Sequence, residues 1–490
     1  MAETGASEGE YDYIIVGAGS AGCLLANRLS ADARQRVLVL EAGGRDNWIW
    51  FHIPVGYLFA IGNPRSDWCF KTEPEEGLNG RSLDYPRGRV IGGSSAINAM
   101  IYMRGQAADY DHWRQLGLAG WGWDDVLPYF MRHENHFMGA SDAHSVGGEL
   151  RIEAPRVRWD LLDAFRRAAE QAGIKSVADF NTGDNEGCCA FHVNQKRGRR
   201  WSAARAFLKP ALRRPNLRLE TDCLVEAVVF EGRRAAGVRW RRGGEVRSAR
   251  CRGEVILAAG SIGSAQLMLL SGIGPAEQLR EHGIPVIADR PGVGANLQDH
   301  LQLRLIYKVD GITTLNERYH SPFGRARMLA EYALFRRGPL TMAPSQLGLF
   351  TRSDPDQDRA NLQYHIQPSL WNAGASRCTN SPRSRPALPT CGRRAAALSG
   401  CARAIRPPSQ SSSRTTSRPT PTAALPPAQF ASRAASWRSP RLRRSIPPNI
   451  CPAPPQPTTT SSRWCRPRAR SARRFFTRSA RPRWGWRAIR

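Results

Sequence analysis

The chain has 490 residues, 41% of them hydrophobic, which is enough for two or three domains with buried cores. Its net charge of +29 is unevenly distributed. Residues 1–372 carry 46 Lys and Arg against 42 Asp and Glu, whereas residues 373–490 carry 25 Arg and no Lys, Asp, Glu or His. A nucleic acid or an anionic membrane would therefore have to bind the last part alone.

Composition also bears on location and metal binding. The sequence has no run of about 18 or more apolar residues, and its acidic N-terminus lacks the basic and apolar stretches of a cleaved signal peptide. The eleven cysteines, six of them before Asn372, show no metal-site spacing. The sequence thus predicts reduced thiols, no metal site, and a location in the cytoplasm or at the periphery of the inner membrane.

The first predicted unit is a strand, a helix and a second strand, at residues 11–16, 23–29 and 37–40. The turn before the helix reads Gly17-Ala18-Gly19-Ser20-Ala21-Gly22, a dinucleotide-binding pattern. Gly17 permits the tight turn, Gly19 lets the backbone approach a pyrophosphate, and Gly22 lets helix and strand pack closely.

The ends of this unit complete the predicted site. Backbone amides at the helix N-terminus, where Ser20 and Ala21 lie, face the phosphates. Glu41 ends the second strand, where its carboxylate can accept hydrogen bonds from ribose hydroxyls, and Ala42 beside it is assigned to the same site.

Three further glycine-rich blocks identify a family. They read GRVIGGSSAINAMIY at 88–102, GSIGSAQLMLLSGIGP at 260–275 and PGVGANLQDH at 291–300. In this order they closely resemble the signature segments of the glucose-methanol-choline oxidoreductases. Similarity to choline dehydrogenase-like members of that family covers about residues 11–375.

The resemblance implies an α/β fold. We expect a Rossmann-type FAD-binding domain at residues 8–155 and 210–310 and an incomplete substrate domain, with an antiparallel sheet, at 156–209 and 311–376. Residues 377–490, rich in Arg, Pro and Ser, are predicted to be a disordered tail.

The resemblance also implies cofactor contacts. The residues assigned to the flavin segment are Gly88, Val90, Gly93, Asn98, Ala99, Met100 and Ile101, and Val225 is assigned to the adenine. Some members tether FAD through a histidine where this chain has Ile97, so we expect non-covalent FAD. Histidines 112, 133, 136 and 144 are expected at the surface or in loops, and His300 and His365 in structural roles.

The implied activity is oxidation of an alcohol to an aldehyde by hydride transfer to flavin, with electrons passing to a quinone or another acceptor. In the family that this chain resembles, the catalytic base is a histidine in an H-P-V-G-T motif. This chain has no histidine after His365. We therefore assign no catalytic residue and expect the chain as written to be inactive. A catalytically dead flavin-binding protein is the alternative, and an Arg-rich nucleic-acid binder is a more remote one.

A shifted reading frame would explain the missing motif. Read in another frame, residues 475–485 accommodate H-P-V-G-T-A-P-M-G, residues 377–393 accommodate L-H-x-F-P-A-F-T-A-S followed by N-L-R-P, and residues 413–417 accommodate P-N-Y-L. All three resemble family segments in family order. We therefore hypothesise that the frame shifts near Ser376.

Overall fold

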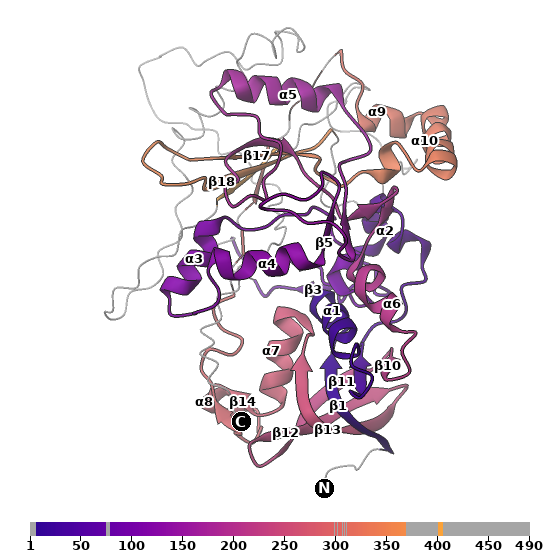
Figure 1. Ribbon diagram of the computed structural model, residues 1–490, viewed down its shortest axis with the longest axis vertical. Coiled ribbons are helices and arrows are strands. Elements are labelled where there is room, and N and C mark those ends of the chain that lie inside the picture. The colour runs from indigo at the N-terminus through magenta and orange to yellow at the C-terminus, as the bar shows by residue number, and fades with distance from the viewer. Residues whose placement is uncertain are drawn as a thin grey trace.

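The computed structural model describes residues 6–368, except 75–78, 298, 301, 306, 308 and 310, together with residues 400–404. Two β-sheets lie at opposite ends of the long axis of the molecule, with helices on and between them (Figure 1). The predicted α/β class with an antiparallel second sheet is confirmed. The predicted disordered tail lies outside the described residues, apart from strand β19 at 400–404.

The first sheet contains six strands and carries the predicted dinucleotide unit. Its order is β10 (Leu217–Glu220), β2 (Val37–Leu40), β1 (Ala6–Val16), β13 (Glu245–Leu257), β12 (Arg234–Arg242) and β11 (Leu224–Glu231). The first four strands are parallel, and β12 and β11 extend the sheet in antiparallel pairing.

Alternating apolar residues cover both faces of this sheet. Ile15 of β1 faces helix α1 (Ser20–Leu29) and the apolar turn 204–208, within one buried cluster. Its neighbour Ile14 points to the other face, where it packs in a second cluster with Trp240 and with Leu267 of helix α7 (Gly260–Leu270). Because successive side chains of a strand point to opposite faces, the adjacent apolar residues Ile14 and Ile15 contribute to the two different cores.

The second sheet is antiparallel and draws on distant parts of the chain. Its order is β16 (Gln302–Leu305), β19 (Gly400–Ala404), β18 (Leu362–Ile366), β17 (Leu347–Thr351) and β7 (Gly187–Ala190). Helix α5 (Asp160–Gln171) packs its apolar face, including Leu161 and Phe165, into the core beneath this sheet. Strand β16 falls within the stretch assigned to the FAD domain, and the proposed domain boundaries stay predictions.

The other elements are short. The helices are α2 (Tyr57–Ala60), α3 (Ala107–Gln115), α4 (Trp123–His133), α6 (Lys209–Ala211), α8 (Ala276–Glu281), α9 (Leu315–His320) and α10 (Pro322–Phe335). The strands are β3 (Phe70–Lys71), β4 (Asp84–Tyr85), β5 (Glu134–His136), β6 (Leu150–Ile152), β8 (Gln195–Lys196), β9 (Arg199–Arg200), β14 (Ile273–Gly274) and β15 (Ala288–Asp289). Among the described residues, no helix combines the length and apolar character needed to cross a bilayer.

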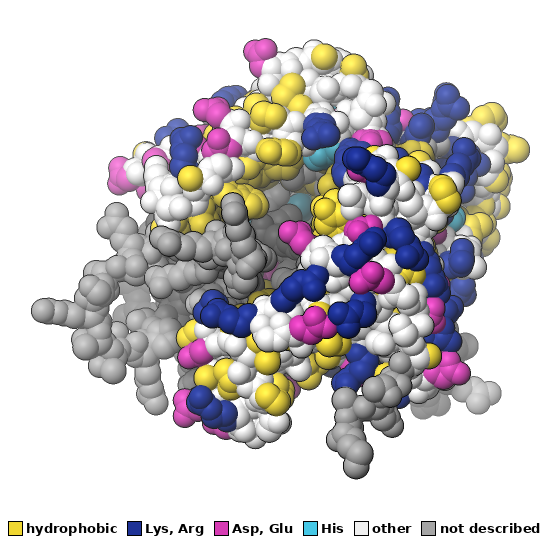
Figure 2. Space-filling view, turned by 60° about the horizontal axis from the view of Figure 1, so that its bottom comes forward, with side chains coloured by type: hydrophobic (Ala, Val, Ile, Leu, Met, Phe, Trp, Pro, Cys, Tyr) yellow, Lys and Arg dark blue, Asp and Glu magenta, His cyan; other side chains and the backbone are white. Residues whose placement is uncertain are grey.

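The arginine-rich strands of the first sheet are paired with acids. Glu8 accepts from Arg218 at 2.9 Å and from Arg247 at 2.7 Å, and Glu220 accepts from Arg242 at 2.6 Å. Lys and Arg side chains are interspersed with Asp and Glu when the molecule is seen with its β12 and β13 end turned forward (Figure 2). This face of the described residues therefore carries charges of both signs.

Helix α1 packs tightly on β1 because Gly22 has no side chain. A Cβ atom at Gly22 would lie 1.9 Å from the carbonyl oxygen of Gly17, which is too close for two atoms that are not bonded to each other. A Cβ atom at Gly19, three residues earlier, would meet nothing closer than the carbonyl oxygen of Ala258 at 3.7 Å.

We therefore expect Gly22→Ala to lower the free energy of unfolding by at least about 1–3 kcal/mol, the usual cost of an overpacked core. Thermal unfolding followed by circular dichroism measures the change. Gly19→Ala is the matched control and should unfold close to the original temperature. Equal stability of the two variants would contradict the packing described for Gly22.

Candidate cofactor site

The turn between β1 and α1 has the conformation that a phosphate-binding turn requires. Gly17 adopts a φ of +99°, which residues with a side chain rarely adopt. Helix α1 begins at Ser20, so its first backbone amides are free of partners within the helix. Such amides, together with the positive end of the helix dipole, form an anion-binding site.

The segment around Gly93 packs directly on this turn. The amide of Gly92 donates to the carbonyl of Ala18 at 2.8 Å. Gly93 has a φ of +52°, and a Cβ atom there would lie 2.7 Å from Cα of Gly19. Two glycine-rich segments about 70 residues apart in sequence thus touch through their backbones, and a side chain at Gly93 would separate them.

Glu41 lies at the carboxyl end of β2, beside the turn. It is 5% exposed, and its carboxylate accepts from the backbone amides of Ala18 and Gly43, each at 2.8 Å. Burial raises the pKa of Glu41 to about 7, against the lowering effect of these two hydrogen bonds. The carboxylate therefore titrates close to neutral pH.

The segment Asn98–Ile101 forms a strained turn. Met100 is 1% exposed and has a φ of 61°, an uncommon value for a residue with a side chain. Its amide donates to Oδ1 of Asn98 at 3.0 Å, and its carbonyl accepts from the amide of Asn194 at 2.8 Å. Held in this way, the Asn98 side chain lies at the exposed surface of the turn.

The structure places the residues assigned to the cofactor at three levels of exposure. Exposed are Ser20, Ala21 and Asn98; partly exposed are Gly17, Gly19, Ala42, Gly88, Ala99, Ile101 and Val225; buried are Gly22, Glu41, Val90, Gly93 and Met100. Val225 lies on β11, two residues from Cys223, whose amide donates to the carbonyl of Glu41 at 2.9 Å. The glycine turn, Glu41 and the segment around Gly93 come together at the ends of β1 and β2, whereas residues 98–101 contact Val193, Asn194 and Arg200. The contacts of all these residues with the cofactor stay predictions.

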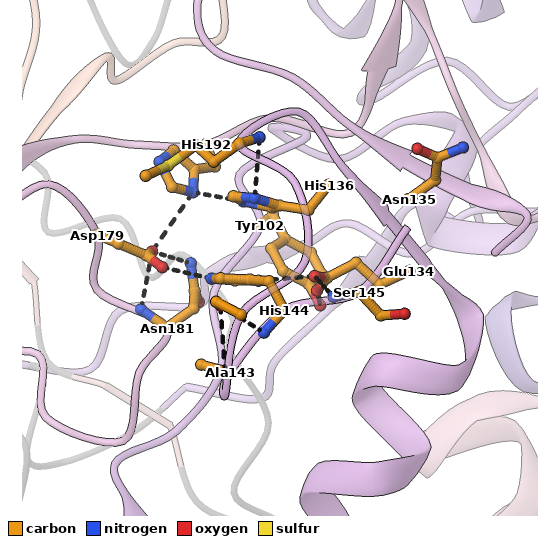
Figure 3. A network of polar contacts seen from close by, with 12 residues as sticks. Tyr102, Glu134, Asn135, His136, Ala143, His144, Ser145, Asp179, Asn181 and His192 are labelled. Atoms are coloured by element: carbon orange, nitrogen blue, oxygen red, sulfur yellow. Dashed lines mark hydrogen bonds and ion pairs between the residues drawn. The ribbon is translucent and has the colours of Figure 1, made fainter. Parts of the chain in front are cut away.

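Sequence reasoning missed a buried polar network (Figure 3). His144 is 4% exposed and bonds Glu134 through Nδ1 at 2.6 Å and Asp179 through Nε2 at 2.5 Å. Glu134 also accepts from Arg104 at 2.5 Å and from Tyr102 at 2.6 Å.

The sequence predicts the four histidines 112, 133, 136 and 144 at the surface or in loops. His144 lies in a loop but is buried, because its two carboxylate partners compensate its burial. The expectation is wrong for His136, which is buried in strand β5 beside His192, and His112 and His133 lie partly buried in helices α3 and α4.

The network fixes the charges of its members. Burial would lower the pKa of His144, but its hydrogen bonds to Asp179 and Glu134 outweigh burial and raise that pKa to about 9. Burial would raise the pKa of Glu134, but the hydrogen bonds from His144 and Tyr102 hold it at about 2. At neutral pH an imidazolium thus lies between two carboxylates.

These residues also have the spacing of a metal site. Ligand atoms of Glu134, His136 and His144 lie within 4.8 Å of one another. The two imidazole rings, however, are stacked, with centroids 3.8 Å apart and planes 11° apart, so their in-plane lone pairs do not converge. Both nitrogens of His144 already bond carboxylates, so the geometry favours a charge network over a metal centre.

We expect His144→Gln to lower the free energy of unfolding by about 3 kcal/mol, because it removes the cation that lies between two buried carboxylates; Glu134 keeps Arg104, whereas Asp179 loses its shortest contact with a cation. The pKa of His144 is raised from 6.5, so its contribution to stability is complete below about pH 6.5 and is lost as the pH rises through about 9. Unfolding temperatures measured from about pH 6 to about pH 9.5 test this loss of stability, because that range covers both the ordinary and the raised pKa of His144.

The control for this experiment is His282→Gln, which changes an exposed histidine at the end of α8. The original chain and the control should lose stability over the alkaline range, whereas His144→Gln should show a flatter curve. Parallel curves for all three proteins would show that His144 is not a buried imidazolium.

Comparison with known proteins places this site in a family. A family model described as GMC oxidoreductase matches residues 11–302. The chain is 44% identical over 359 residues to the oxygen-dependent choline dehydrogenase of Brucella anthropi, which covers 73% of this chain and 65% of that protein. It is 42% identical over 363 residues to the alcohol dehydrogenase (acceptor) of Pseudomonas putida, covering 73% of this chain and 66% of that protein.

A solved structure shows the same fold. The crystal structure of pyridoxine 4-oxidase from Mesorbium loti superposes with a TM-score of 0.68 at 29% identity, covering 81% of this chain and 72% of the other. The chain spans slightly less than two thirds of the length of the choline dehydrogenase that it matches.

The described residues fit FAD, the cofactor of this family. Gly19 leaves the turn open where a pyrophosphate would approach, while Gly17, Gly22 and Gly93 close the backbone around it. Near the Asn98–Ile101 turn, Nδ2 of Asn194 and Oε1 of Gln195 are buried without a hydrogen-bond partner, and a polar cofactor ring could supply one. The chain belongs to the GMC oxidoreductase family of FAD-dependent proteins.

Proposed function

We propose that this chain is the FAD-binding part of an enzyme that oxidises an alcohol to an aldehyde. The observation that carries the proposal is the backbone contact between Gly93 and Gly19, which joins the phosphate-binding turn to the Asn98–Ile101 turn. When bound, FAD supplies the acceptor for the hydride that leaves the alcohol carbon. The relatives named above, a choline dehydrogenase and an alcohol dehydrogenase, support this reaction class.

Each part of the site has a role in the proposal. Backbone amides at Ser20 and Ala21 bind the pyrophosphate, and Glu41 accepts hydrogen bonds from the ribose hydroxyls. The Asn98–Ile101 turn orients the flavin ring, and Val225 contacts the adenine. Ile97 is 3% exposed in an apolar cluster, and its side chain offers no atom for a covalent link to FAD.

Choline is one candidate substrate among aliphatic and aromatic alcohols, and a quinone or another acceptor would take the electrons. The name of the Pseudomonas putida relative, which specifies an acceptor, supports the second point. We place the protein in the cytoplasm or at the periphery of the inner membrane.

The chain as written lacks the histidine that would take the hydroxyl proton, because no histidine follows His365. We infer that it binds FAD without oxidising alcohols. A catalytically dead flavin-binding protein fits the same residues and is the competing function.

FAD affinity should depend on pH through Glu41. Ribose hydroxyls bind the ionised carboxylate, so protonation below about pH 7 should weaken binding by up to about tenfold per pH unit. Because the pKa of Glu41 is raised in the folded protein, protonation of Glu41 between pH 7 and 4.5 stabilises the free protein. Unfolding caused by protonation of Glu41 therefore would not account for the weaker binding of FAD. Quenching of FAD fluorescence between about pH 5.5 and pH 8 measures the dissociation constant.

In this experiment, Glu41→Gln should bind FAD more weakly and with a dissociation constant that no longer varies over the same range. A variant that retains the pH dependence of the original chain would show that another group is responsible.

The test of the function itself compares two coding sequences. The chain as given, loaded with FAD, should leave the flavin absorbance unchanged when choline or a primary aliphatic alcohol is added without oxygen. A gene repaired to the alternative frame after codon 376 should give a protein whose flavin is bleached by its substrate. Bleaching by the given chain would overturn the inferred loss of activity, and failure of the repaired protein with every alcohol tried would favour the dead flavin-binding protein.

A further inference from the structure

Arg200 is a fully buried cation without a carboxylate partner. Its side chain is 0% exposed, and none of the Asp and Glu residues in the described part of the chain forms an ion pair with it. Its donors instead meet the Oδ1 of Asn98 at 2.8 Å and three backbone carbonyls, while its Nε has no partner among the described residues. Buried arginines usually pair with acids, because a lone buried charge is costly.

The charge persists at neutral pH despite this cost. Burial lowers the pKa of Arg200 to about 9, which still leaves the guanidinium protonated at pH 7. Carbonyl and amide oxygens solvate the guanidinium as dipoles but do not neutralise it. The fold therefore keeps one uncompensated positive charge at this position.

The contacts of Arg200 converge on one residue of the cofactor site. One nitrogen of the guanidinium donates to Oδ1 of Asn98 at 2.8 Å and another donates to the backbone carbonyl of Asn98 at 2.7 Å. The same Oδ1 accepts the amide of Met100, the residue held at a φ of 61°. Arg200 thus donates to both oxygens of the residue that stabilises the strained turn.

The planar geometry of the guanidinium explains why this residue is an arginine. Its fork reaches the two oxygens of Asn98 at once, and also the carbonyl of Ser95 at 3.2 Å and that of Pro54 at 3.5 Å. The compact ammonium of a lysine cannot span the same set of acceptors. The adjacent Arg199 on β9 is partly exposed and belongs to the same short strand.

We propose that Arg200 is a positioning residue that holds the Asn98–Ile101 turn against the flavin ring and that its unneutralised charge favours negative charge on that ring. The inference rests on the proposed FAD site and extends it to a residue that itself lies outside the assigned contacts. Asn98 transmits the position of Arg200 to the turn, and its exposed side chain forms the surface on which the ring lies.

The test uses the full chain with FAD and four variants. Arg200→Gln removes the charge, Arg200→Lys keeps the charge but loses the fork, and Asn98→Asp keeps both acceptor oxygens while placing a carboxylate beside Arg200. Arg199→Gln is the matched control from the same strand. For each protein we would measure the unfolding temperature, the FAD dissociation constant and the midpoint potential of the bound flavin.

The proposal predicts a distinct result for each variant. Arg200→Gln should weaken FAD binding at least about tenfold and lower the midpoint potential, as expected when a buried charge is lost. Arg200→Lys should weaken binding with little change in potential, and Asn98→Asp should lower the potential while the protein stays folded. Arg199→Gln should match the original chain in all three measurements.

Two outcomes would overturn the proposal. The first is a folded Arg200→Gln protein with the original dissociation constant and potential, which would make Arg200 a packing residue only. The second is an unchanged potential in Asn98→Asp, which remains informative if Arg200→Gln does not fold. If the original chain itself binds no FAD, the proposed cofactor site fails instead, and that result is separate from both.

Discussion

The backbone contact between Gly93 and Gly19 is the constraint on which the cofactor site depends. A Cβ atom at Gly93 would lie 2.7 Å from Cα of Gly19, so any side chain there would push the two segments apart. The contact is reinforced by the hydrogen bond from Gly92 to Ala18 at 2.8 Å. Because the first segment begins helix α1 and the second leads to the Asn98–Ile101 turn, this one contact sets the distance between phosphate-binding and ring-binding groups.

Two buried charges of opposite sign mark the ends of this arrangement. Glu41 is solvated by the amides of Ala18 and Gly43, and Arg200 by the oxygens of Asn98 and neighbouring carbonyls. Among the described residues, neither charge has a side-chain counterion as a hydrogen-bond partner. Burial raises the pKa of Glu41 and lowers that of Arg200, which in each case favours the neutral form. A pKa shifted by burial is typical of residues at binding and catalytic sites. In a purely structural ion pair, each buried charge would have a partner of opposite charge.

The sequence predicted those parts of the fold that are encoded locally. The strands at 11–16 and 37–40, the glycine turn and Glu41 follow one another within about 30 residues, and each leaves a pattern that period and composition reveal. The network around His144 could not be found in this way, because its partners Arg104, Glu134 and Asp179 are scattered along the chain. Its histidines look like polar loop residues until tertiary structure buries them beside acids. Arg200 likewise carries no spacing in the sequence that marks it as buried.

The residues assigned to the cofactor and the core of the second sheet come from largely different parts of the chain. The residues assigned to the cofactor, together with Arg200, lie within the first 225 residues, and some of their hydrogen bonds join members of this set, such as Met100 to Asn98 and Arg200 to Asn98. The second sheet has its own core, in which Leu161 and Phe165 of α5 pack with Leu347 and Leu349 of β17. Because the two cores share none of these residues, the proposed shift of frame near Ser376 should disturb the second sheet more than the proposed FAD site. On the proposed function, FAD binding and turnover should therefore be lost independently, and FAD affinity is the measurement that reports on the proposed cofactor site.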